Sequence, residues 1–245
     1  MRNIVYVVFS YFIVSIGFLV SGEMIRVPDG LYHPLTIGND LDFEYVKSFE
    51  IDQYPVTVFE YLRFLKENPH WVRSQASPIY VGFSYLKNWK SDFDPGEKVE
   101  LQAPVSQVSW FAAKYFCHYY GKRLPTLAEW EYIAAEPMPS IKKILTFYIK
   151  QDLHASTKVG FSYKNRNGIY GLHGLVFEWV FDYDSDVYLG DGRESSEAEK
   201  VESFCGGGAF GVSDLANYPA FIRKSFRNNL YAQYSSTNLG FRCVK

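Results

Sequence analysis

The stretch RLPTLAEWEY, residues 123–132, decides the fold. Its Thr126 and Glu129 have the spacing of a capping box, in which the threonine hydroxyl accepts a hydrogen bond from the third helical amide and the glutamate reaches back to the threonine amide. A helix is therefore predicted from residue 127 to about Glu136, where Pro137 ends it.

Two further helices are predicted upstream. Thr57 and Glu60 form a second capping box, and the helix behind it is expected from about Val58 to Asn68, before a proline. Ser109 can cap a third helix that ends at Gly121. Helical spacing places Cys117 on the buried face of this third helix.

The remaining chain predicts short strands and loops. Residues 50–56 alternate loosely and contain a proline, as at a strand end or turn. Residues 70–100 have no period and are expected to form a long ordered loop, which in a compact domain is used for function or wraps the core. Residues 141–164 are ambiguous between helix and strand, and residues 177–183 alternate like a strand. The chain is therefore expected to be a mixed α+β protein.

The N-terminal residues 1–22 have the pattern of a secretory signal peptide, with one arginine, an apolar run and small residues before Glu23. An uncleaved membrane anchor is the alternative. Residues 23–245 are expected to form one domain, secreted or held in the periplasm or another extracytoplasmic space. Because such compartments are oxidising, the three cysteines permit one disulfide and leave one thiol.

The net charge of −2 and the absence of a basic block in the sequence do not favour nucleic acid as a partner. A membrane partner is expected only if the N-terminal segment is uncleaved. Aromatic residues make up 18% of the chain, which provides bulky packing and aromatic surface for ligands.

Several segments together resemble, in order and spacing, the sulfatase-modifying-factor domain of formylglycine-generating enzymes. They are EIDQYPVTVFEYLRFL (50–65), APVSQVSWFAAKYFCHYYGKRLPTLAEWEYIAA (103–135), NGIYGLHGLVFEWVFDY (167–183), the glycines of CGGGAF (206–208) and NLGFR (238–242). The resemblance covers roughly Met24 to Cys243. It implies an irregular, loop-rich C-type-lectin-like fold with few helices and short antiparallel strands.

In these enzymes a pair of cysteines spaced C-x4-C holds copper(I) and activates oxygen, converting a substrate cysteine to formylglycine. Soft thiolates are the ligands that copper(I) requires. In this sequence, counting back from NLGFRC without gaps places the pair at Asp214 and Pro219. Counting forward from the glycines places it at Gly211 and Ala216. No cysteine lies between Gly206 and Arg242 in the sequence, so copper is not expected.

The resemblance also implies that Cys117 pairs with Cys243, which leaves Cys205 as a buried thiol or an intermolecular bridge. A calcium site is not predicted either. Leu175 takes the place of the family's asparagine ligand although Glu178 is retained, and hard cations need several oxygen ligands.

Residues 211–237 are rich in Asn, Tyr, Ser and Phe, the composition of binding loops. The alternative is that they only coat a loop-rich surface. The candidate ligand contacts are Asp214, Asn217, Tyr218, Arg223, Arg227, Asn228, Tyr231 and Tyr234. Arg242 is instead expected to be structural, with its guanidinium forked onto carboxylates or carbonyls. His173, in a glycine-rich turn, is the outlier among the five histidines.

Two functions follow as hypotheses. One is an exported binding or accessory protein that presents residues 211–237 to a protein, peptide or glycan in the envelope or outside the cell. The alternative is a divergent metal-dependent oxidase that matures a peptide, protein or metabolite, with ligands gathered from distant parts of the chain.

Overall fold

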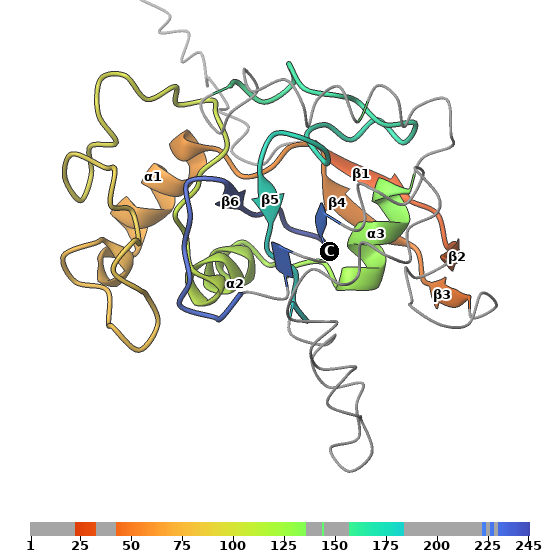
Figure 1. Cartoon of the computed structure of the whole chain (residues 1–245), viewed down its shortest axis with the longest axis horizontal. Helices are drawn as coiled ribbons and strands as arrows, with labels where there is room; N and C mark the ends of the chain where they lie inside the picture. The colour runs from red at the N-terminus through yellow and green to blue at the C-terminus, as the bar shows by residue number, and fades with distance from the viewer. Residues whose placement is uncertain are drawn as a thin grey trace, which may run out of the picture.

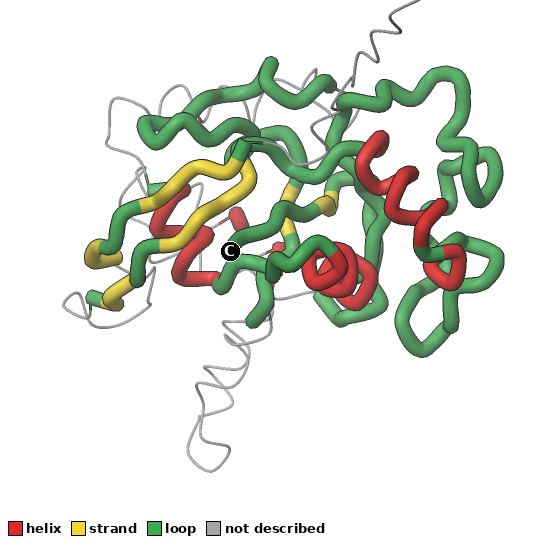
Figure 2. The backbone as a smooth tube through the Cα atoms, turned by 180° about the vertical axis from the view of Figure 1, so that it is seen from behind, coloured by secondary structure: helices red, strands yellow, loops and turns green. Residues whose placement is uncertain are grey.

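The computed structural model describes residues 23–32, 43–135, 144, 157–183, 222–223, 226–227 and 230–245. Within them the protein is α+β and loop-rich, which confirms the predicted fold class (Figures 1 and 2). The helices are α1 (Val58–Glu67), α2 (Trp110–Tyr119), α3 (Leu127–Ala134) and the 3-10 turn η1 (Pro69–Trp71). The strands are β1 (Met24–Val27), β2 (Gly30–Tyr32), β3 (Glu44–Val46), β4 (Phe49–Asp52), β5 (Phe177–Glu178) and β6 (Leu239–Gly240).

The three helices begin where the capping residues predict. In α1 the Glu60 amide donates to Thr57 Oγ1 at 3.2 Å, and Glu60 Oε2 accepts from the Thr57 amide at 2.8 Å. Thr126 and Glu129 repeat both bonds at α3, and Ser109 caps α2. The observed ends of α1 and α2 fall one or two residues before the predicted ones, because the last turns become caps and turns.

The strands form a ribbon and a short parallel pair. β1 pairs antiparallel with β4, and β2 with β3. β4 confirms the strand expected at the start of residues 50–56, while β1, β2 and β3 were not predicted. β5 pairs in parallel with β6 over two residues, so the strand expected over residues 177–183 is shorter than its alternation indicated.

The predicted long loop, residues 70–100, is irregular and lies over the core. It buries Trp71, Tyr85 and Leu86 against the helices. Arg73 Nη1 holds it by donating to the carbonyls of Leu86, Lys87 and Trp89. Of the ambiguous residues 141–164, positions 141–143 and 145–156 lie outside the described residues.

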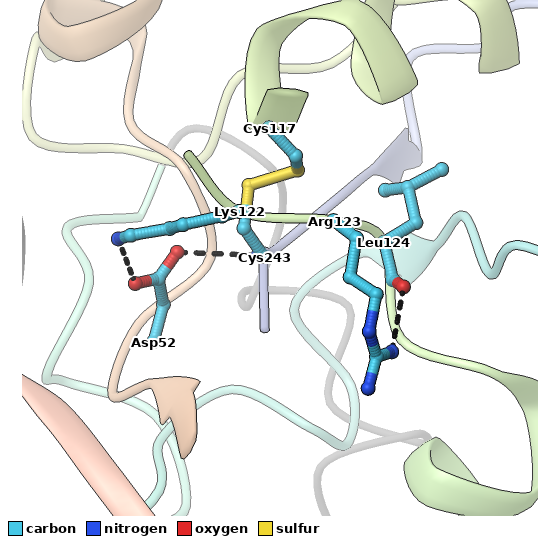
Figure 3. Close-up of a disulfide and its surroundings, with 6 residues drawn as sticks. All are labelled: Asp52, Cys117, Lys122, Arg123, Leu124 and Cys243. Carbon is cyan, nitrogen blue, oxygen red and sulfur yellow. Dashed lines mark hydrogen bonds and ion pairs between the residues drawn. A yellow bond between two sulfur atoms is a disulfide. The ribbon is translucent and has the colours of Figure 1, made fainter. Parts of the chain in front are cut away.

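A disulfide joins Cys117 on α2 to Cys243, as the resemblance implied (Figure 3). The two Cα atoms are 5.6 Å apart, and both cysteines are buried. Asp52 lies beside the bridge, where Oδ2 accepts from the Cys243 amide at 3.2 Å and Oδ1 accepts from Lys122 Nζ at 2.6 Å. Cys205 lies outside the described residues.

The C-terminal residues run between distant segments of the core. Val244 exchanges two 2.8 Å backbone hydrogen bonds with Arg123, and Lys245 donates to Glu50 O at 2.8 Å. Close packing also explains the glycine of NLGFR, because a Cβ on Gly240 would lie 2.5 Å from Val105 O. The segment that ends the chain is thus built into the interior (Figure 1).

Candidate functional site

Exposed and half-buried aromatic and apolar side chains form a group, called here the aromatic strip. Its exposed members are Ile79, Tyr80, Phe83, Phe181 and Tyr231, and its half-buried members are Trp110 and Phe111. Four of its rings are in contact in a row. The Tyr80 and Phe111 centroids are 5.3 Å apart, Phe111 and Trp110 are 5.3 Å apart, and Trp110 and Phe181 are 6.1 Å apart.

At one end of the aromatic strip, the long loop is hydrogen-bonded to residues 230–245, called here the C-terminal segment. The Gly82 amide donates to Gln233 O at 3.0 Å, and Gln233 Nε2 donates to Ile79 O at 3.1 Å. Ile79 is 71% exposed and Phe83 is 86% exposed. These hydrogen bonds fix two large apolar side chains in solvent, beside the segment that carries Tyr231.

The start of α2 holds the middle of the strip. Trp110 donates its backbone amide to Ala232 O and its indole Nε1 to Val180 O, each at 3.0 Å. The C-terminal segment passes close to α2 in Figure 1, in agreement with the first of these bonds. The strip thus draws on four segments that are distant in sequence, and α2 is hydrogen-bonded to two of the other three.

A lysine lies at each end of the strip. Lys114 Nζ is 4.6 Å from the Trp110 ring centroid and 5.1 Å from that of Phe181. Lys87 Nζ is 5.9 Å from the centroid of the Phe83 ring. Both are cation–π contacts, which attract an ammonium to the electron-rich face of a ring.

A buried charge cluster lies in the interior of the domain, on α3. Glu131 Oε2 accepts from Arg223 Nη2, and Oε1 accepts from Arg227 Nη1, each at 2.5 Å. The two guanidinium carbons lie 5.0 and 5.2 Å from the Trp130 ring centroid. Burial alone would raise the pKa of Glu131, but the two arginine charges and their hydrogen bonds outweigh it and lower the pKa to about 2.

His173 extends this cluster. Arg223 Nη1 lies 3.3 Å from its Nδ1, and its Nε2 lies 3.1 Å from Ala134 O. Since a guanidinium can only donate, Nδ1 accepts and Nε2 carries the proton. Burial and the positive charge of Arg223 lower the pKa of His173 to about 3, so the ring is neutral at physiological pH.

Arg242 has the structural role that the sequence predicted. It is fully buried and donates to both oxygens of Glu178 at 2.7 Å. It also donates to the backbone carbonyls of Asp52, Gln53 and Tyr170.

The residues at the family's calcium position do not fit the ion. Glu178 has its two oxygens committed to Arg242, and Oε2 also accepts from Trp130 Nε1 at 2.8 Å. Leu175, in the place of the asparagine, is buried and has no oxygen in its side chain.

The copper positions do not fit copper(I) either, because residues 211, 214, 216 and 219 include no thiol. They lie outside the described residues. Within the part of the chain that the structure describes, no three residues of the types His, Cys, Asp and Glu come together as a metal-binding group.

The candidate ligand contacts divide into three groups. Tyr231 is 52% exposed and belongs to the aromatic strip, and Tyr234 packs against it with ring centroids 5.5 Å apart. Arg223 and Arg227 are buried and bonded to Glu131, so a ligand would reach them only by displacing that carboxylate. Outside the described residues are Asp214, Asn217, Tyr218 and Asn228.

Sequence reasoning did not single out Ile79, Phe83, Lys114 or Glu131. The first two lie in a segment without periodicity, where exposure depends on the tertiary fold. The aromatic content of residues 70–100 was the available signal for them. For Glu131, the available signal was a glutamate on the inner face of a predicted helix, which calls for a partner.

None of the helices in the described part of the chain combines the length and the apolar character needed to cross a bilayer. The N-terminal segment, residues 1–22, lies outside that part.

Comparison with known proteins gives a family match over most of the chain. The model described as "Sulfatase-modifying factor enzyme 1-like domain" matches residues 21–245. The inactive C-alpha-formylglycine-generating enzyme 2 of Bos taurus is 27% identical over an alignment of 252 positions, gaps included, and the match covers 81% of this chain and 77% of that protein.

Other relatives are longer proteins. The serine/threonine-protein kinase pkn1 of Chlamydia pneumoniae is 27% identical over 216 residues, and the match covers 81% of this chain but only 33% of the kinase. The chain therefore spans about a third of the length of such relatives. Among solved structures, that of PvdO from Pseudomonas aeruginosa aligns with a TM-score of 0.53 at 21% identity, covering 92% of this chain and 95% of that one. This likeness concerns the fold.

Proposed function

The chain belongs to the sulfatase-modifying factor enzyme 1-like domain family, and from that premise we propose that it is an exported binding or accessory protein whose aromatic strip binds a partner protein. The exposure of Ile79 and Phe83 carries this proposal, in a loop that is held by the Gly82 amide donating to Gln233 O and by Gln233 Nε2 donating to Ile79 O.

The chemistry of the aromatic strip favours a protein partner. Contiguous exposed apolar side chains mark interaction sites, and aromatic side chains are enriched at the centres of protein interfaces. Ile79 and Phe83 have no polar atoms in their side chains, so they suit an apolar partner surface better than the hydroxyls of a glycan. Tyr231 adds a rigid ring with a hydroxyl that can bond to backbone groups.

Two further observations support a non-oxidase role. The sequence has no cysteine pair where the family holds copper. In addition, a relative that is named as inactive matches 81% of this chain.

Export is part of the proposal. The N-terminal pattern supports it, and the apolar run ends before residue 21, where the family match begins. The Cys117–Cys243 disulfide fits an oxidising compartment.

The test is selection of a random dodecapeptide phage library on the immobilised full chain. We expect enriched peptides that bind the wild-type chain at least about tenfold better than a Phe83→Ser/Tyr231→Ser variant, since buried aromatic anchors dominate binding energy. A Phe43→Ser variant is the matched control. Phe43 is an exposed ring directly before β3, which lies at the opposite end of the molecule from α1 (Figure 1).

Two results would overturn the proposal. One is that no peptide is enriched on the chain above uncoated resin, or that the enriched peptides bind the Phe83→Ser/Tyr231→Ser variant as well as they bind the wild type. The other is oxygen consumption by the purified chain with a cysteine-containing sulfatase peptide and a stoichiometric bound metal, which would make it an oxidase.

A further inference from the structure

The two lysines at the ends of the aromatic strip each lie over an aromatic ring. Lys114 follows Trp110 by four residues on α2, so both side chains lie on one face of the helix. Its ammonium lies over the rings of Trp110 and Phe181, which come from different segments. The ammonium of Lys87 lies over the ring of Phe83, and Phe83 is four residues earlier in the chain.

Neither ammonium is neutralised within the described part of the chain. Both lysines are exposed, and the ion pairs formed by the described carboxylates involve other cations. Asp92, the acidic residue nearest to Lys87 in sequence, accepts hydrogen bonds from Ser74. Asp182, which follows Phe181, uses Oδ1 to accept from the Leu127 amide at 2.7 Å.

A partner that covers the aromatic strip must also cover these two charges. Moving an ammonium out of water costs several kcal/mol unless an opposite charge accompanies the partner. An acidic group in the partner would both compensate for this cost and steer the encounter. Because contacts with two rings already restrict the Lys114 ammonium, less side-chain entropy is lost when it pairs with an acidic group.

We propose that the bound segment of the partner is an apolar or aromatic peptide with acidic side chains that pair with Lys114 and Lys87. This inference rests on the proposed function, since it specifies what the aromatic strip binds. It predicts that the strip selects peptides by their charge as well as by their apolar side chains.

The test uses the same dodecapeptide library on the full chain and on charge variants. Peptides selected by the wild-type chain are expected to carry at least about twice the Asp and Glu of the unselected library. Peptides selected by a Lys87→Glu/Lys114→Glu variant should be enriched in Lys and Arg instead. A synthetic acidic peptide chosen on the wild type should bind this variant at least about tenfold more weakly, because like charges then face each other.

Two controls separate charge from folding. Lys98→Glu reverses an exposed lysine outside the strip and should leave the selected peptides unchanged. Lys87→Gln/Lys114→Gln removes the charges without reversing them and should abolish the acidic bias while retaining binding of apolar peptides. Each variant is checked by thermal unfolding against the wild type.

The outcomes distinguish this inference from the proposed function. If peptides are selected and depend on Phe83 and Tyr231 but show no acidic bias, the inference is wrong and the binding function stands. The same holds if the bias persists in the Lys87→Glu/Lys114→Glu variant. If no peptide is selected, both fail.

Discussion

Glu131 is the residue on which the interior charge balance depends. One carboxylate accepts hydrogen bonds from two arginines that follow it by 92 and 96 positions, and all three side chains are buried. Both guanidinium groups also lie against Trp130. The single glutamate thus fixes the described parts of a segment that is otherwise far from α3 in sequence.

Glu131→Gln is expected to lower the free energy of unfolding by about 3–5 kcal/mol, because it leaves two buried guanidinium charges without their counter-charge. Urea denaturation at pH 7 measures this. Glu67→Gln is the matched control, since Glu67 pairs with Arg63 on the surface and should cost less than about 1 kcal/mol. Equal losses for the two variants would show that the buried cluster does not stabilise the fold.

His173 predicts how stability depends on pH. Its folded pKa of about 3 lies below the unfolded value of 6.5, so the unfolded chain binds a proton first as pH falls. The stability contribution of the neutral ring is complete above about pH 6.5 and is lost toward pH 3, at up to about 1.4 kcal/mol per pH unit. Glu131 loses its contribution only between about pH 4.5 and 2.

The window between pH 6.5 and 4.5 lies above the range in which Glu131 titrates, so a change of slope there on removal of the imidazole reports on His173. We expect that His173→Gln is less stable at pH 7 but has a flatter stability profile in this window, measured by urea titrations at each pH. His70→Gln, at an exposed site, should retain the wild-type slope. An unchanged slope in His173→Gln would contradict the assignment of the neutral ring.

At the scale of elements, the sequence predicts the helices well and the strands poorly. A capping box is a local signal, because Thr126 and Glu129 satisfy each other's backbone groups within four residues. Strands of two to four residues such as β1 and β5 have no comparable signal, and their partners lie far along the chain. Pairing alone defines them.

The same difference applies to the candidate site. Tyr231 is indicated by the composition of its segment, whereas the exposure of Phe83 depends on how the long loop packs, including the bond from the Gly82 amide to Gln233 O. Glu131 was visible as a helical glutamate, but Arg223 and Arg227 could not be paired with it, since these contacts arise from tertiary packing.

Gly240 tests the element-scale packing of β6. Gly240→Ala is expected to destabilise the protein by about 1–3 kcal/mol, because the added Cβ would meet the Val105 carbonyl oxygen at 2.5 Å and the backbone must move apart. Chemical denaturation provides the measurement. Thr237→Ala, at an exposed position just before β6, should change stability by less than about 0.5 kcal/mol. A neutral Gly240→Ala would mean that the two segments separate at little cost.

At the scale of the molecule, the final residues connect segments that are distant along the chain. Cys243 is bonded to Cys117, Val244 pairs with Arg123, and Lys245 with Glu50. Arg242 connects the same segment to Glu178 on β5. Removing any one of these links affects the docking of the whole segment.

Removal of the bridge has a calculable cost. A Cys117→Ser/Cys243→Ser variant is expected to lose about 5 kcal/mol on the chain-entropy model, since the disulfide spans 126 residues. The guanidinium midpoint under non-reducing conditions gives the value. Cys205→Ser keeps the bridge and is the control, and a double variant as stable as Cys205→Ser would show that the bridge adds nothing to the fold.

The position of these links also determines when the protein can fold. Residues 239–245 are translated after every segment that they contact. The other core residues therefore leave the ribosome before β6 is present to pair with β5. Contacts of such long sequence separation form slowly. The core of this domain therefore cannot be completed until residues 239–245 have been translated and have left the ribosome. Formation of the Cys117–Cys243 bridge must wait for the same step, because Cys243 belongs to this late segment.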